Sequence, residues 1–151
     1  NNLKTAIMKN VILFAAIAIS AIGCAQSKEK KEVPKVVKEA FQKEYPNTKV
    51  DWDIEADGFE AEFKMNGKEA SANYDKVGHK LATEIEIKES ELPAKALTYI
   101  TTTYPNKKIK ETAKITDNKN VVTYEAEIKI DGKDRDLIFD ASGKFLRLHK
   151  D

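Results

Sequence analysis

The acidic stretch DWDIEADG holds the side chains whose type and spacing come closest to a chemical site. Asp51, Asp53, Glu55 and Asp57 occupy alternate positions, and carboxylate oxygens are ligands that calcium prefers. An EF-hand loop needs glycine at its sixth position, whereas the glycine of this stretch is its eighth residue. Because apolar residues separate the acids, the alternation predicts a β-strand rather than a calcium loop.

The rest of the chain does not predict catalysis. His79 falls in a predicted turn and His149 is among the last three residues, so we expect both at the surface. The sequence has no G-x-S-x-G, H-E-x-x-H or glycine-rich phosphate motif. Cys24 is the single cysteine, so no cysteine cluster can bind zinc. We therefore predict a protein that is not an enzyme and that has no cofactor and no metal site.

Cys24 follows a short apolar run, and this position suggests a different chemistry. The run is too short to cross a bilayer, which needs about 20 apolar residues, and is typical of a signal-peptide core. Residues 21–24, AIGC, resemble a bacterial lipobox, whose cysteine is diacylated; an ordinary signal peptide with an incidental cysteine is the alternative. We expect a signal peptide at 1–23, with its start at Met8, and a lipidated charged tether at 24–32. The prediction is an exported lipoprotein of the bacterial cell envelope, on its periplasmic or surface face.

The charge balance excludes one large class of partners. The chain carries 26 basic and 25 acidic side chains, and loss of residues 1–23 removes only Lys4 and Lys9. Proteins that bind nucleic acid carry basic stripes that neutralise phosphates. We therefore expect no nucleic-acid partner, and contact with the membrane through the lipid anchor alone.

Two motifs occur twice in the chain. YPN begins at Tyr45 and again at Tyr104, and EAE begins at Glu60 and again at Glu125. Such self-similarity indicates one supersecondary unit that is used twice. The offset between the copies grows from 59 residues at YPN to 65 at EAE, which places a six-residue insertion in the first hairpin of the second copy.

Each copy is predicted to form a helix followed by four strands. Apolar residues recur at helical spacing before each YPN, whose proline ends the helix. Beyond it the period falls to two, and glycine-containing turns separate the strands. One copy alone would be marginal, because small domains bury too little surface. We therefore predict an α+β domain at 33–151, with repeats at 33–88 and 92–148. Its α-β-β-β-β repeats form one antiparallel sheet of about eight strands, with both helices on one face.

The residues shared by the two copies also carry a family resemblance. They are Val33-Pro34, Ala40-Phe41, Tyr45-Pro46, Trp52, Phe59 to Phe63, Asn66-Gly67 and Gly78 in the first copy, and Leu92-Pro93, Tyr104-Pro105, Lys108 to Glu111, Tyr124 to Ile128, Phe139-Asp140 and Gly143 in the second. This pattern resembles the PepSY domain, and its tandem form resembles the PepSY-like, β-lactamase-inhibitor-protein-like family of Bacteroidetes lipoproteins and secreted proteins. The resemblance implies the fold above and a non-catalytic role, since single PepSY domains accompany secreted peptidases and are thought to restrain them. Every matched position is a core or turn position, so no inhibitory contact residue carries over.

The polar positions of the strands define the face of the sheet opposite the helices. The candidate partner-binding residues there are Asp51, Asp53, Glu55, Glu60, Glu62, Lys64, Glu125, Glu127 and Lys129. The same alternation adds Glu69, Ser71, Asn73, Glu84, Glu86, Lys88, Lys110, Thr112, Lys114, Thr123, Asp134 and Asp136. It puts Ala113 and Ile115 on the helix side. The plain interpretation is a solvated face with cross-strand charge pairs, and the sharper one is a docking face for a protein.

Two functions remain open from the sequence. The preferred one is a non-catalytic envelope lipoprotein that acts as a protein-binding module, as an inhibitor or regulator of a secreted or envelope enzyme such as a peptidase. The alternative is an envelope protein that binds a small ligand or cation in the cup of the sheet, through the carboxylates between Asp51 and Glu62.

Overall fold

The computed structural model describes residues 32–150. The predicted signal peptide at 1–23, the lipidation site Cys24 and the tether as far as residue 31 lie outside the described residues. Within the described range, no helix has the length and apolar character needed to cross a membrane.

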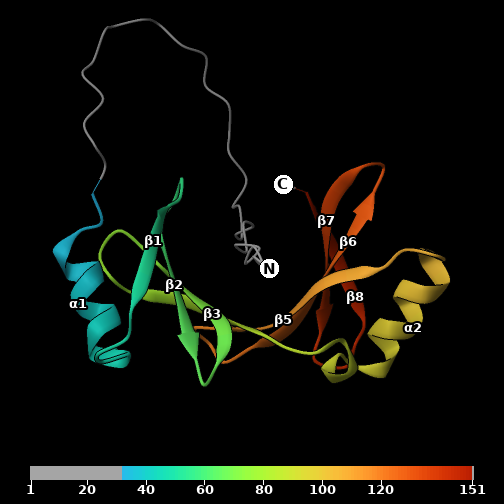
Figure 1. The fold of residues 1–151 in the computed structure, drawn as a ribbon, viewed down its shortest axis with the longest axis horizontal. Coiled ribbons are helices and arrows are strands. Elements are labelled where there is room, and N and C mark those ends of the chain that lie inside the picture. Colours follow the sequence, from blue (N-terminus) through green and yellow to red (C-terminus); the bar gives the residue numbers. More distant parts are fainter. Residues whose placement is uncertain (1–31, 151) are drawn as a thin grey trace, which may run out of the picture.

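Two α-helices and eight strands make up an α+β fold, as the sequence predicts (Figure 1). The strands form a single antiparallel sheet in which neighbours in the chain are neighbours in space, from β1 at one edge to β8 at the other. Each repeat contributes one helix and four strands. The elements are α1 (Lys35–Glu44), β1 (Val50–Ile54), β2 (Phe59–Met65), β3 (Lys68–Tyr74), β4 (Lys80–Glu86), the 3₁₀ helix η1 (Glu89–Glu91), α2 (Ala94–Thr103), β5 (Ile109–Asp117), β6 (Val122–Ile130), β7 (Lys133–Asp140) and β8 (Phe145–Lys150).

Both helices cover the same face of the sheet, one near each end (Figure 1). Ile85 of β4 packs against the core beneath α1, and Tyr124 of β6 packs against the core beneath α2. Lys114 of β5 lies directly opposite both Ile85 and Tyr124 in the strand register. Directly paired residues point to the same side of a sheet, so α1 and α2 lie on one face.

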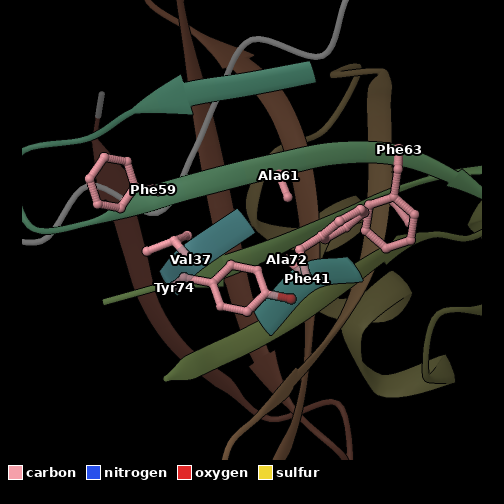
Figure 2. Packing of buried hydrophobic residues seen from close by; sticks show 8 residues of the cluster. Val37, Phe41, Phe59, Ala61, Phe63, Ala72 and Tyr74 are labelled. Carbon is pink, nitrogen blue, oxygen red and sulfur yellow. The ribbon is translucent and has the colours of Figure 1, made fainter. Parts of the chain in front are cut away.

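The helix side of the sheet holds two separate hydrophobic cores. In the first, Phe41 of α1 lies beside Phe63 of β2, with ring centroids 5.2 Å apart (Figure 2). In the second, Tyr99 of α2 stacks on Phe145 of β8, with centroids 4.6 Å apart. Between the two cores the helix side carries Lys114, which is exposed. The repeats therefore share a sheet rather than one core.

The six-residue insertion lengthens the first hairpin of repeat two. Strand β5 has nine residues where β1 has five, and β6 has nine where β2 has seven. The part of β5 that pairs with β4 runs from Ala113 to Asp117. Ala113 is the last β5 residue with an equivalent in β1, so the inserted residues supply nearly all of the junction between the repeats.

A bulge in β5 corrects one prediction about the two faces. The register shifts between Ile109 and Glu111, and an unpaired residue inverts the alternation of everything after it. Thr112 and Lys114, predicted on the face opposite the helices, therefore point to the helix side. Ala113 and Ile115 point to the opposite face, where they are buried.

The repeated YPN motif marks the end of each helix. The backbone N–H of Tyr45 donates to the carbonyl of Phe41, and Tyr104 closes α2 in the same way. Two residues later, Asn47 and Asn106 have φ values of 59° and 68°. Asparagine tolerates this left-handed conformation better than other side chains, which explains its place in the motif.

Candidate functional site

The candidate site is the sheet face opposite the helices, called the acidic face below. The strand register places on it eight of the nine candidate residues, and Glu55 follows directly after β1. They form two groups. Asp51, Asp53, Glu60, Glu62 and Lys64 lie on the β1–β2 hairpin. Glu125, Glu127 and Lys129 lie on β6, with β3, β4 and β5 between the two groups.

The β1–β2 hairpin carries an acid cluster made of Asp53, Glu60 and Glu62. One carboxylate oxygen from each lies within 4.8 Å of the others. Asp53 pairs with Glu60, and Asp51 pairs with Glu62, although like charges directly opposite each other destabilise a sheet. Glu60 is only 4% exposed. Burial raises the pKa of Glu60 to about 7, and the charges of Glu62, Glu55 and Asp53 act in the same direction, against a hydrogen bond from Ser71.

A second buried acid occupies the middle of the sheet. Glu84 of β4 is 5% exposed. Burial raises its pKa to about 8, and the charges of Glu60, Asp136 and Glu111 add to the shift. Acids from both repeats therefore act on one another across the acidic face.

In the second repeat a lysine neutralises acidic side chains of the acidic face. Lys110 Nζ lies 3.0 Å from Glu127 Oε1 and 2.7 Å from Asp134 Oδ1. These contacts raise the pKa of the lysine, and the hydrogen bond from Lys110 lowers the pKa of Asp134. Lys129 Nζ lies 3.9 Å from the same Asp134 oxygen. The β6 group is thus largely neutralised, whereas the acid cluster on the first hairpin is not.

A cavity of about 270 Å³ opens on the acidic face between the two repeats. The β1–β2 loop lines one side and β8 lines the other, so the sheet curls enough to bring its ends toward one cavity. Its apolar lining includes Ala82, Ile115 and Ile138. Its polar lining includes Glu125 and Arg147.

The two histidines differ in their surroundings. The ring of His79 lies 2.9 Å from Asp75 in an exposed turn, as expected. His149 lines the cavity, its side chain is 20% exposed, and its Nδ1 lies 3.9 Å from Asp136 Oδ2. His149 is therefore half-buried rather than fully exposed as expected, because its side chain lines the cavity.

Comparison with known proteins now identifies the fold. Residues 25–81 and 57–147 match the family described as "Putative beta-lactamase-inhibitor-like, PepSY-like". The chain belongs to this family. No curated protein matches the sequence.

Several solved structures share the fold of this chain. A "putative periplasmic" protein of Bacteroides eggerthii superposes with a TM-score of 0.69 at 15% identity, over 79% of this chain and 89% of that one. A DUF2874 family protein of Bacteroides uniformis gives 0.67 at 18% identity, over 77% and 88%. A BLIP-like protein of Bacteroides fragilis gives 0.62 at 23% identity, over 79% and 86%. Identities this low show a common fold and not a common target.

Sequence reasoning missed part of the site of this PepSY-like protein. Glu111 lies on the acidic face because of the bulge, which no periodicity signals. Ile138 and Arg147 reach the cavity only because the sheet curls. In the sequence, Ile138 and Arg147 are direct neighbours of residues of the second core, Leu137 and Leu148. This alternation was the one sign that they face the opposite side of the sheet.

Proposed function

We propose that this PepSY-like protein is a non-catalytic binding module of the cell envelope, which docks a protein partner, such as a secreted or envelope enzyme, on its acidic face. The observation that carries the proposal is the cavity on that face, because both repeats line it. Its position away from both helices leaves it open to a partner. The candidate acids Glu55 and Glu125 stand on opposite sides of it.

The chemistry of the acidic face specifies the partner's surface. An apolar lining with acids around it suits a loop that inserts an apolar side chain and carries basic residues beside it. The volume, about 270 Å³, lies below the roughly 300–1,000 Å³ of drug-sized ligand sites. The cavity is therefore large enough for one side chain of a protein loop.

The proposed location is the periplasmic or outer surface of a bacterial membrane. Two observations support it: the lipobox-like sequence at Cys24, and the fold shared with a "putative periplasmic" protein. A lipid at Cys24 would hold the module at the membrane surface, where secreted and envelope enzymes pass.

A pull-down from the native envelope fraction tests this function. The protein is immobilised as wild type, as the charge-reversed variant Glu55→Lys/Glu125→Lys, and as the matched control Glu39→Lys/Glu89→Lys, whose exposed acids lie in α1 and η1. The wild type and the control should retain the same protein, and the face variant should lose it. Equal retention by all three forms would rule out docking on the acidic face.

A further inference from the structure

The acid cluster on the first hairpin contains a buried carboxylate oxygen that lacks a partner. Glu60 is 4% exposed, and its Oε2 accepts no hydrogen bond within the described part of the chain. An unsatisfied buried charge is costly unless a cation or a proton compensates it. Asp53 and Glu62, which bring carboxylate oxygens within 4.8 Å of that of Glu60, are acidic as well. The hairpin thus concentrates negative charge where the fold offers no compensation.

The second repeat provides an internal comparison. Lys110 stands at the position of Asp51, counted from the YPN motif, and Glu127 stands at the position of Glu62, counted from the EAE motif. Lys110 Nζ lies 3.0 Å from Glu127, whereas Asp51 faces Glu62 with a second negative charge. Repeat two therefore carries its own cation at the place where repeat one carries another acid.

The ligand set indicates the kind of cation. The three side chains are carboxylates, which suit hard cations such as calcium and magnesium rather than softer metals. Oxygens bound to one calcium lie at most about 5 Å apart, because each bond is about 2.3–2.6 Å long. The corresponding limit for magnesium is about 4 Å. The three carboxylate oxygens lie within 4.8 Å of one another, a span that one calcium ion can bridge. Magnesium is usually held by only one or two carboxylates, so a set of three favours calcium.

We propose that Asp53, Glu60 and Glu62 bind one calcium ion on the β1–β2 hairpin. Asp53 and Glu60 approach it from adjacent strands, and Glu62 adds a third carboxylate two residues along β2. Asn73, directly opposite Glu60 on β3, offers an amide oxygen from the same face. Water would supply the remaining calcium ligands on the solvent-exposed side, next to Asp53. The site does not depend on the protein partner proposed above.

Titration calorimetry with calcium chloride on the purified full-length protein tests the site. We expect one calcium ion per chain, weaker binding of magnesium, and a melting temperature several degrees higher in calcium than in chelator, because the ion binds the folded form. Absence of saturable binding up to about 10 mM, above the range of the weakest protein calcium sites, would overturn the proposal. Equal affinity for magnesium would overturn the assignment to calcium.

Matched variants then locate the site. Glu60→Gln should weaken calcium binding by at least about tenfold through loss of a charged ligand. Glu125→Gln, the equivalent change in repeat two, should leave calcium binding unchanged. Asp53→Asn alters an exposed side chain and removes a like charge opposite Glu60, so it should lower the calcium affinity without lowering the melting temperature in chelator. Equal effects of Glu60→Gln and Glu125→Gln, or wild-type affinity in Asp53→Asn, would contradict the assignment.

Discussion

Glu84 is an acid whose place in the sheet changes its affinity for a proton. It lies at the middle of the acidic face on β4, yet it is 5% exposed. Its pKa rises to about 8, mainly through burial, from 4.5 for the same group in water. The folded protein therefore binds a proton at Glu84 in a pH range where the unfolded chain has released it.

This shift predicts how stability changes with pH. Between about pH 4.5 and about pH 8 the folded state holds the extra proton, so the free energy of unfolding falls as the pH rises through this window. In a buffer with chelator, Glu84→Gln should flatten this part of the melting-temperature profile and raise the melting temperature most at pH 8. Glu86→Gln, an exposed acid on the same strand, is the control. Identical pH profiles for the wild type and Glu84→Gln would refute the assignment.

At Gly58 the fold leaves no room for a side chain. A Cβ placed on it would lie 2.1 Å from the carbonyl oxygen of Tyr74. Gly58→Ala should therefore lower the free energy of unfolding by about 1–3 kcal/mol, as overpacking does. Asp57→Ala, an exposed neighbour in the same loop, should change it by no more than about 0.5 kcal/mol. Denaturant titration measures both, and a neutral Gly58→Ala would show that the loop can move away from β3.

At the scale of elements, the YPN motif fixes where each helix stops. Asn47 has a positive φ of 59°. Asn47→Ala should destabilise the protein by about 1–2 kcal/mol, the usual cost of a left-handed alanine, whereas Asn47→Gly should cost less because glycine adopts this conformation freely. Denaturant titration compares the two variants. If both cost the same, the side chain rather than the backbone conformation of Asn47 is what matters.

Most elements were predictable from the sequence because their signals are local. Helical spacing before YPN predicts α1 and α2, and turn sequences such as Asn66-Gly67 separate the strands. Which residues of β5 face the helices was not predictable, because the bulge after Ile109 depends on the pairing of β5 with β6. The cavity could not be predicted for a similar reason. Strands from both repeats line it, and the curl of the sheet sets the distance between those strands. The candidate acids were found because strict alternation places them opposite the core.

On the scale of the whole molecule, two cores are joined through one sheet. The junction between β4 and β5 runs from Ala82–Asp117 to Glu86–Ala113. On the helix side the two apolar clusters stay separate, whereas on the acidic face the junction buries Ala82, Ala113 and Ile115. Each repeat is small enough to be marginal alone, so we expect the repeats to unfold together.

Trp52 allows a test of this coupling, because it is the single tryptophan and lies in repeat one. Ile100→Ala removes a buried side chain of α2, in repeat two, and should cost about 2–5 kcal/mol. If the molecule unfolds as one unit, the fluorescence transition of Trp52 shifts together with the circular dichroism transition. An unshifted fluorescence transition would show two independently folding repeats.

Both repeats contribute to the one binding surface proposed on the acidic face. Photo-cross-linking in the native envelope tests it most directly, with a photoreactive side chain placed at Glu55 in repeat one, at Arg147 in repeat two, or at Lys38 on the exposed side of α1. We expect the photoreactive groups at Glu55 and Arg147 to capture the same protein, and the one at Lys38 not to capture it. Capture of that protein from Lys38 alone, or of different proteins from Glu55 and Arg147, would contradict it.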